Sequence, residues 1–210
     1  TVNTPPTANA VSTTGNEDAT ITVTLSATDS DGTIASYTVT ALPANGKLYR
    51  DSGLTQEITS TGTVVTGATL YFKPNANWNG STSFTYTATD NQGASSAPAT
   101  VSLTVNSVAD LTATNDSVTT PEDVAYTGSV ATNDSTTSGG TLVFVKASDP
   151  GNGSVTVATD GTYTYTPNAN WSGTDTFTYT VTDSASGEIA TRTVTVTVTP
   201  VADPLSSPGA

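Results

Sequence analysis

The sequence predicts an all-β protein made of two tandem Greek-key β-sandwich domains joined by a short linker. Three observations lead to this fold: apolar residues alternate with threonine, the 210 residues contain an internal repeat, and turn residues recur at the spacing typical of sandwiches. Alternation with a period of two marks strands that bury one face. No segment has the 3.6-residue period of an amphipathic helix, so we expect little helix.

Alternating strands are predicted in both halves of the chain. The residues expected to face inward are Ile21, Val23, Leu25, Phe84, Tyr86, Ala88, Val101, Leu103 and Val105 in the first half, and Phe177, Tyr179, Val181, Val194, Val196 and Val198 in the second. Between two further runs, Asp160-Gly161 is a two-residue hairpin signal. The 48 threonines suit solvated strand faces, because β-branched residues favour strands. An ice-binding threonine array would need regular rungs, which these unevenly spaced strands lack.

The repeat sets the domain organisation. Residues 71–110 align without a gap on residues 164–203, with 20 identities in 40 positions. The motif Pro-Asn-Ala-Asn-Trp-x-Gly begins at Pro74 and again at Pro167. Glu17-Asp18 recurs as Glu122-Asp123 at a larger offset, so the first unit carries about twelve extra residues, which we place within 42–68. We therefore expect domains at 1–107 and 108–210, in a chain cut from a longer array.

The composition excludes most enzyme and nucleic-acid functions. Cys, Met and His are all absent, which removes thiol nucleophiles, His/Cys metal sites and imidazole acid-base catalysis. Eighteen acidic against five basic residues give a formal charge of -13, which opposes binding to nucleic acid and anionic lipid. No run of about 18 apolar residues could span a membrane. We expect a soluble, non-enzymatic protein whose natural partners are cations.

The acidic residues gather at strand ends and at the linker. Calcium takes six to eight oxygens from carboxylates, amides, backbone carbonyls and water. Asp29-Ser30-Asp31-Gly32 places two carboxylates in a tight loop after a strand, Asp90 ends another strand, and Asp110 lies in the linker. Such a loop, taken alone, is also typical of a turn with side-chain caps. The whole constellation is more specific than any of its parts.

The order of these groups resembles the cadherin repeat. Both units are more closely similar to the bacterial cadherin-like, tandem-95 type Ig-like repeats of very large secreted adhesins, including those of the RTX kind. The resemblance covers nearly the whole chain through Glu-Asp, Pro-Asn-Ala-Asn-Trp-x-Gly, Phe-Thr-Tyr-Thr-x-Thr-Asp and Val-Ala-Asp. It implies monomeric extender repeats at the bacterial surface or outside the cell, stiffened by Ca²⁺, with neighbouring repeats as partners. Host glycans or proteins would be bound by other domains.

The resemblance also implies the metal ligands. Those of the internal junction would be Glu17, Asn106, Asp110, Asp134 and Asp183. Asp29, Asp31 and Asp90 would serve a junction with a preceding unit, and Glu122 and Asp203 one with a following unit. Asp134 lies in a segment that lacks the second Asp of the Asp-x-Asp motif, so we expect that junction to bind fewer ions or to bind them more weakly. Asn115, Asp116 and Asp123 could compensate.

Two other functions remain open. One unit could be a carbohydrate-binding domain, with Trp78 or Trp171 as a stacking platform or with a site in the insertion around 47–66. Both tryptophans recur in the repeat, which favours a packing role. An enzyme could use Asp29 and Asp31 as the carboxylate pair of a glycosidase, but such pairs face a substrate cleft. Adjacent positions in a loop rich in other oxygens favour a metal ion instead.

Overall fold

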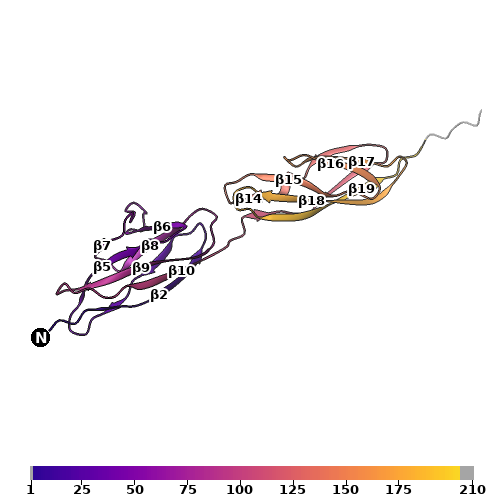
Figure 1. Cartoon of the computed structure of the whole chain (residues 1–210). Helices are drawn as coiled ribbons and strands as arrows, with labels where there is room; N and C mark the ends of the chain where they lie inside the picture. The colour runs from indigo at the N-terminus through magenta and orange to yellow at the C-terminus, as the bar shows by residue number, and fades with distance from the viewer. Residues whose placement is uncertain (1, 204–210) are drawn as a thin grey trace, which may run out of the picture. The chain divides into compact units, whose positions relative to one another are not determined.

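The computed structural model describes residues 2–203. By their contacts the residues divide between Val108 and Ala109 into two compact units, called unit 1 and unit 2 below (Figure 1). Strands dominate both, and the 3-10 helix η1 (Val130–Asn133) is the one helical element among the described residues. None of these residues belongs to a helix long and apolar enough to cross a lipid bilayer. The predicted all-β class is confirmed.

Unit 1 is a sandwich of a five-stranded and a three-stranded sheet. The larger sheet has the order β2-β10-β9-β5-β7 and the smaller one β3-β8-β6, and the short strands β1 and β4 pair beside them. The strands are β1 (Thr7–Ala8), β2 (Val11–Asn16), β3 (Ile21–Thr24), β4 (Ala27–Thr28), β5 (Ile34–Ala41), β6 (Gly46–Tyr49), β7 (Thr63–Val65), β8 (Thr69–Pro74), β9 (Gly80–Asp90) and β10 (Ala99–Asn106).

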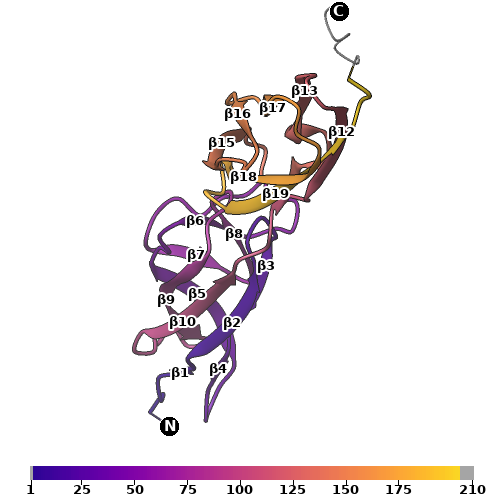
Figure 2. The same cartoon turned by 90° about the vertical axis from the view of Figure 1, so that its right-hand side faces the viewer.

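Unit 2 repeats this architecture with a four-stranded and a three-stranded sheet. Its sheets have the orders β12-β19-β18-β15 and β13-β17-β16, and β11 pairs with β14 (Figure 2). The strands are β11 (Leu111–Thr112), β12 (Asp116–Pro121), β13 (Tyr126–Ser129), β14 (Ser135–Thr136), β15 (Leu142–Ser148), β16 (Gly153–Val157), β17 (Thr162–Pro167), β18 (Gly173–Asp183) and β19 (Ile189–Thr199).

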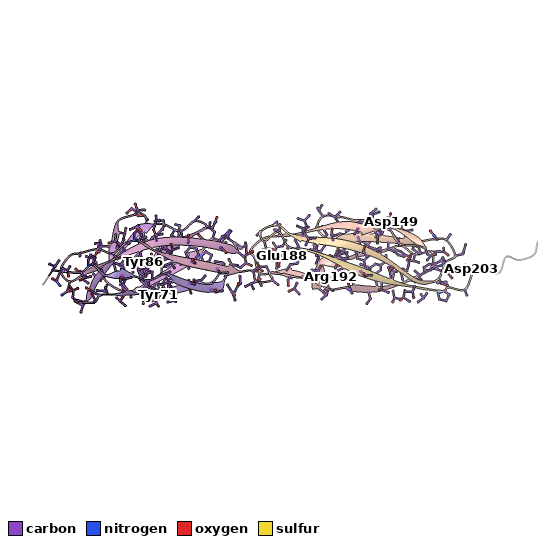
Figure 3. The ribbon with its side chains drawn as sticks, turned by 60° about the horizontal axis from the view of Figure 1, so that its bottom comes forward. Tyr71, Tyr86, Asp149, Glu188, Arg192 and Asp203 are labelled. Atoms are coloured by element: carbon purple, nitrogen blue, oxygen red, sulfur yellow. The ribbon has the colours of Figure 1, made fainter. Side chains whose placement is uncertain are left out.

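One parallel pair of strands in each unit gives the sandwich two distinct ends. β2 runs parallel to β10, with Asn16 opposite Asn106, and β12 runs parallel to β19, with Pro121 opposite Thr199. The residues that follow each of these strands therefore meet at one end, called the C-pole. The opposite end, the N-pole, contains the β1–β4 or the β11–β14 pair. Figure 3 shows Glu188 and Asp203 toward opposite ends of unit 2.

The predicted inward residues form the two cores. All nine of the first-half set and all six of the second-half set are buried. The cores also include residues that the sequence analysis did not single out, among them Phe72 and Leu48 in unit 1 and Phe144 and Tyr165 in unit 2. Aromatic side chains at alternate strand positions are among the largest fully buried residues of both cores, and each buries a large apolar area.

Two local predictions are refined by the structure. The extra residues of unit 1 lie between β6 and β8 and include β7, which adds an edge strand to the larger sheet by pairing with β5. The hairpin between β16 and β17 forms as predicted, but its connection is Ala158–Gly161 and not two residues. Gly161 adopts a positive φ of 90° and its N–H donates to Ala158 O, which closes the longer turn.

Candidate functional site

The N-pole of unit 1 brings together three of the predicted metal ligands. Asp90 ends β9 and is 2% exposed, whereas Asp29 and Asp31 follow β4. Asp31 accepts the backbone N–H of Thr4 at 3.0 Å, and Asp29 Oδ1 accepts that of Asp31 at 3.2 Å. Asn3 joins the group, since its Nδ2 donates to Asp90 Oδ2 at 2.8 Å. The first residues of the unit are thus fixed to acidic loops.

Two oxygens at this N-pole are buried without a hydrogen-bond partner among the described residues. They are Asp29 Oδ2 and Asn3 Oδ1. An ideal Cβ on Gly32 would lie 2.7 Å from Asp29 Oδ2 and 2.5 Å from Asn91 Oδ1, so these two oxygens converge on one small space. Buried oxygens are normally satisfied, and carboxylate and amide oxygens are the ligands that calcium takes. The residues of this N-pole therefore fit a hard cation.

The N-pole of unit 2 is built differently around Asp183, which is fully buried. Both of its oxygens accept protein hydrogens: Oδ2 from the hydroxyl of Thr136, and Oδ1 from the hydroxyl of Ser138 at 2.7 Å and the N–H of Ala185 at 3.0 Å. Burial alone would raise the pKa of Asp183, but these hydrogen bonds outweigh it and hold the pKa well below its usual range. The hydrogen bonds from Thr136, Ser138 and Ala185 therefore favour the ionised form of Asp183.

Asp110 and Glu188 complete this N-pole. Asp110 is buried, and its Oδ1 accepts the hydroxyl of Thr137 at 2.7 Å. Its Oδ2 is buried without a hydrogen-bond partner among the described residues. Glu188 Oε2 accepts the backbone N–H of Asp110 at 2.8 Å and that of Leu111 at 2.7 Å. Figure 3 labels Glu188, which immediately precedes β19.

Asp134 does not take the place that the sequence alignment gave it. Its Oδ1 accepts the N–H of Thr114 at 2.8 Å, and its Oδ2 lies 3.1 Å from the hydroxyl of Tyr179. The same hydroxyl lies 3.0 Å from Asp116 Oδ2. Asp134 is therefore engaged beside Asp116, and not in the set of donors around Asp183. The resemblance placed Asp134 among the ligands of the internal junction, and the structure places it beside Asp116 instead, because β14 pairs with β11 through Ser135 and Thr136.

The C-poles hold the two glutamates of the Glu-Asp motifs. Glu17 is buried; its Oε1 accepts the N–H of Val108 at 2.6 Å and its Oε2 accepts Asn79 Nδ2 at 3.2 Å. Glu122 is buried in the same way, and its Oε1 accepts the N–H of Val201 at 2.5 Å. Each glutamate therefore holds the segment that leaves its own unit, a role that needs no metal ion.

The second residue of each motif caps the Pro-Asn-Ala-Asn-Trp loop. Asp18 Oδ1 accepts the N–H of Asn77 at 2.9 Å, and Asp123 Oδ1 accepts that of Asn170 at 2.8 Å. The tryptophans of this loop pack against the cores, Trp78 in unit 1 and Trp171 in unit 2. This placement agrees with the packing role that the sequence favoured.

The predicted ligands do not all converge. Asn106 and Asp203 are exposed at the C-poles of units 1 and 2. No group of three or more acidic side chains within residues 2–203 lies close enough together to hold a metal ion. A cation at the N-pole of unit 1 would therefore need amide or backbone oxygens beside the carboxylates, as calcium accepts. The buried carboxylates near the linker are consistent with calcium binding.

Sequence reasoning missed several residues of these ends. Asn3, Asn91, Glu188, Thr136 and Ser138 all contact or neighbour the predicted aspartates. Nothing in the local sequence marks them, since hydroxyl and amide residues occur throughout the chain. A further buried carboxylate was not considered at all: Asp175 accepts the hydroxyl of Tyr165 at 2.9 Å and the backbone N–H groups of Gly151 and Asn152.

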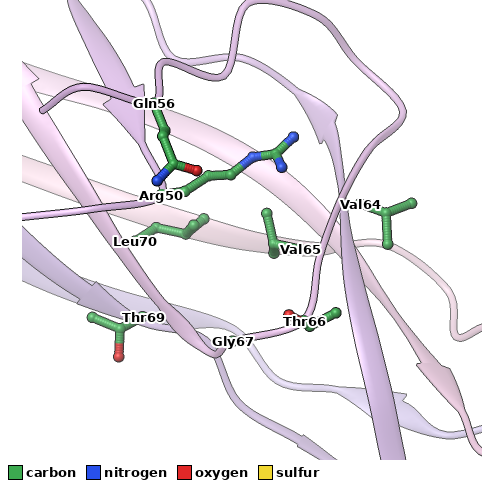
Figure 4. Close-up of a pocket in the computed structure, with 8 residues that line it drawn as sticks. All are labelled: Arg50, Gln56, Val64, Val65, Thr66, Gly67, Thr69 and Leu70. Atoms are coloured by element: carbon green, nitrogen blue, oxygen red, sulfur yellow. The ribbon is translucent and has the colours of Figure 1, made fainter.

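A separate cavity lies beside the insertion of unit 1. It has a volume of about 300 Å³ and is lined by Arg50, Gln56, Val64, Val65 and Leu70 among others (Figure 4). The guanidinium of Arg50 has no partner among the described residues. The side chains of the other four basic residues are engaged: Lys47 by Glu57, Lys73 by Asp18 O, Lys146 by Asp149, and Arg192 by the carbonyls of Ala113 and Thr191.

Comparisons with known proteins give one family match and several distant structural matches. A model of the bacterial cadherin-like domain matches residues 3–107 and again residues 109–200. Among curated proteins, none matches the chain. Similar solved structures include the extracellular domain of protocadherin gammaB4, at 18% identity and a TM-score of 0.39 over 92% of this chain and 34% of that one.

Two further structures show the same level of similarity. Drosophila N-cadherin EC1-3 has 12% identity and a TM-score of 0.36, over 95% of this chain and 69% of that one. An endo-fucoidan hydrolase from glycoside hydrolase family 107 has 19% identity and a TM-score of 0.37 over 94% of this chain. The present chain spans 29% of the length of that hydrolase.

Proposed function

Because the chain belongs to the bacterial cadherin-like domain family, we propose that units 1 and 2 are extender repeats in the stalk of a large secreted or surface adhesin of the RTX kind. Domains of this family are typically found in extracellular or surface proteins. In this proposal the units are non-enzymatic and monomeric, and calcium at the ends of the repeats stiffens the array. Other domains of the parent protein would bind the adhesion target.

The observation that carries the proposal is the recurrence of buried carboxylates at equivalent places of the fold. Asp90 and Asp183 lie at the N-poles, and Glu17 and Glu122 lie at the C-poles. In a series of such domains, each C-pole would meet the N-pole of the next repeat, and a divalent cation bound there would restrict the linker.

The physical mechanism is electrostatic. Without metal, carboxylates at the ends repel each other, and a net charge of -13 adds to this repulsion. Extracellular calcium modules have dissociation constants of about 10⁻⁴ to 10⁻³ M. Free calcium at about 100 times the dissociation constant would stabilise the folded state by roughly 2.7 kcal/mol per site. The array would then be stiff outside the cell and flexible at the low calcium concentration of the cytosol.

The test is a thermal melting curve combined with small-angle scattering of the whole chain. Both are measured in EDTA and then across a calcium titration to several millimolar, with magnesium as the ion control. We expect a calcium-specific rise in the melting midpoint. A longer, narrower distance distribution would show in addition that calcium acts at the linker. Asp29→Asn should weaken the rise in the melting midpoint, because it removes the charge of a carboxylate with an unsatisfied oxygen at the N-pole of unit 1. Glu57→Gln, on a surface ion pair with Lys47, is the matched control. No response of wild type in either measurement would refute the calcium mechanism.

A second candidate function is recognition of an acidic sugar by unit 1. The observation in its favour is the cavity beside the insertion, where the unpartnered guanidinium of Arg50 lies above the buried side chains of Val65 and Leu70 (Figure 4). Arginine binds carboxylates through two parallel hydrogen bonds, and a cavity of about 300 Å³ accommodates one sugar ring. The ligand class would be a sugar that carries a carboxylate.

This candidate is tested by NMR titration of the whole chain with glucuronate, with glucose as the neutral control. Shifts confined to residues 50–70, seen with glucuronate alone and lost in Arg50→Gln, would support recognition of an acidic sugar. Equal responses to both sugars, or no response to either at tens of millimolar, would rule it out.

A further inference from the structure

The two N-poles can be aligned residue by residue through their hydrogen bonds. Tyr86 donates its hydroxyl to Asn9 O, and its repeat counterpart Tyr179 lies in the same way 3.1 Å from Thr114 O. Asn9 therefore corresponds to Thr114, and the preceding Thr7 to Thr112. Thr7 lies opposite Thr28 in the β1–β4 pair, whereas Thr112 lies opposite Ser135 in the β11–β14 pair.

This register decides which residues of unit 2 stand where unit 1 has its Asp-x-Asp motif. Since Thr28 corresponds to Ser135, the next residues correspond as well. Asp29 is matched by Thr136, and Asp31 by Ser138. Two carboxylates of unit 1 are thus replaced by two hydroxyls in unit 2. Local sequence similarity does not reveal the exchange, because the aspartate nearest to these positions, Asp134, lies two residues earlier.

The two hydroxyls of unit 2 point to Asp183, the carboxylate that is equivalent to Asp90 of unit 1. Both donate to Asp183, Thr136 to Oδ2 and Ser138 to Oδ1. The equivalent carboxylate of unit 1, Asp90, receives one side-chain donor, Nδ2 of Asn3. Asp29 Oδ2 is left unsatisfied in unit 1, whereas the side-chain oxygens of Thr136 and Ser138 all have partners. A hydroxyl supplies the hydrogen that a carboxylate lacks, so the exchange converts a repulsive group into a hydrogen-bonded one.

Glu188 provides a second substitution at the same end. Asp90 N donates to Ala94 O and Asp183 N donates to Glu188 O, both at 2.9 Å, so Glu188 stands where unit 1 has Ala94. Its carboxylate binds the N–H groups of Asp110 and Leu111, at the start of unit 2. Charge-assisted hydrogen bonds of this kind are about twice as strong as neutral ones. The first strand of unit 2 is therefore held by a side chain of its own unit.

We propose that Thr136 and Ser138 take the place of a metal ion at the N-pole of unit 2, so that this end of the repeat keeps its structure without a divalent cation. The N-pole of unit 1, with Asp29 and Asp31 at the same positions, depends on calcium. The comparison between the two ends rests on the proposed calcium binding of unit 1. The statement about unit 2 rests on the hydrogen bonds of Asp183. One buried oxygen at this end has no partner among the described residues, Asp110 Oδ2, and the other oxygen of that carboxylate accepts the hydroxyl of Thr137.

The experiment is residue-resolved amide hydrogen exchange of the whole chain by NMR, in EDTA and in several millimolar calcium. The reporters are the N–H groups bound by the two aspartates: Gln92 and Ala94 on Asp90, and Ala185 on Asp183. We expect Ala185 to be protected in EDTA and unchanged by calcium. Gln92 and Ala94 should become roughly tenfold or more better protected when calcium is added.

Two double variants test the role of the hydroxyls. Thr136→Val with Ser138→Ala removes both donors and should reduce the protection of Ala185 in EDTA by roughly tenfold or more. Thr136→Asp with Ser138→Asp gives unit 2 the two carboxylates that unit 1 has at these positions. Protection of the Ala185 N–H should then fall in EDTA and recover with calcium. Ser154→Asp with Thr156→Asp, at two exposed positions of β16, adds the same charge away from this end and should do neither.

The outcomes separate this inference from the proposed function. The inference about unit 2 is overturned if calcium raises the protection of Ala185 in wild type. It is also overturned if the Thr136→Val, Ser138→Ala variant (the Val/Ala variant) protects Ala185 in EDTA as well as wild type does. If Gln92 and Ala94 ignore calcium while the Val/Ala variant behaves as expected, the calcium mechanism of unit 1 fails and the role of the hydroxyls stands.

Discussion

The carboxylate of Glu17 accepts a hydrogen bond from the backbone N–H of Val108 at 2.6 Å, across 91 residues of sequence. Glu122 makes the same bond to Val201 in unit 2. The Glu-Asp motif thus fixes the last segment of each unit to the turn that follows its first long strand. This contact exists within a single repeat, so it contributes to the stability of each unit whether or not calcium is bound.

Glu17→Ala should destabilise unit 1 even in EDTA. Glu17 is buried, and the substitution removes the charged acceptor of the N–H of Val108 and of the amide of Asn79, which costs about 1 to 3 kcal/mol. Urea denaturation in EDTA measures the loss. Glu57→Ala, which breaks an exposed ion pair with Lys47, should change stability by less than about 1 kcal/mol. Equal effects of the two variants would contradict the structural role of Glu17.

The stability of unit 2 should fall in acid through Asp183. The pKa of this carboxyl is held below its usual range, because hydrogen bonds led by that of Thr136 outweigh the effect of burial. A carboxyl whose pKa is lower in the folded state stabilises the folded protein at pH values above its unfolded-state pKa of about 4. This contribution is lost as the pH falls toward the folded-state pKa. Thr136→Val should raise the pKa of Asp183, measured by NMR titration of its carboxyl carbon. Thr159→Val, at an exposed position, should not.

Asp134→Asn should stabilise unit 2 at neutral pH. Asp116 and Asp134 share the single hydroxyl proton of Tyr179, and burial together with the charge of Asp134 raises the pKa of Asp116. Because the pKa of Asp116 is higher in the folded than in the unfolded state, Asp116 contributes to stability below its unfolded-state pKa. This contribution is lost as the pH rises through the folded-state pKa. Removing the charge of Asp134 should recover part of the stability that is lost at neutral pH. We expect a gain of roughly 0.5 kcal/mol at pH 7, allowing for solvent screening of the partly exposed pair.

Thermal melts at pH 7 and pH 4 measure this effect, and the gain should shrink at the lower pH. Asp149→Asn makes the same charge change at an exposed ion pair with Lys146 and should give no comparable gain. A destabilised Asp134→Asn protein at pH 7 would show that the hydrogen bonds of Asp134 outweigh its repulsion with Asp116.

Gly173→Ala should destabilise unit 2 by about 1 kcal/mol or more. Gly173 has a φ of 147°, and a Cβ there would lie 2.9 Å from the indole of Trp171. The variant would strain the backbone and displace the tryptophan from its place against the core. Gly151→Ala is the matched control, because its nearest contact would be 3.7 Å and its φ is not positive. Trp171 fluorescence during urea unfolding reports both effects, and equal midpoints would contradict this packing role.

The architecture could be predicted from local pattern alone. Phe177, Tyr179 and Val181 are two residues apart, and such spacing places them on one side of any strand that forms. Their counterparts Phe84, Tyr86 and Ala88 repeat the pattern, so one half of the chain supports the assignment of the other. The hairpin at Asp160-Gly161 was located for the same reason, although its exact length depends on the hydrogen bond between Gly161 and Ala158.

The ends of the units could be predicted only in part. Asp90 and Asp183 were found because they close strands of clear alternation, and Glu17 and Glu122 because they recur. Glu188 and Asn3 carry no such mark. Their partners are Asp110 and Asp90, which lie 78 and 87 residues away in sequence. Contacts over that distance depend on how strands pair, which local pattern does not specify.

The sequence by itself determined that this chain is a duplicated, acidic β-sandwich without thiols or imidazoles. These properties depend on composition and on a period of two, both of which are local. The tertiary structure decided that Thr136, and not Asp134, occupies the position of Asp29. That assignment depends on the register of β14 against β11, and a shift of two residues in register exchanges a carboxylate for a hydroxyl beside Asp183.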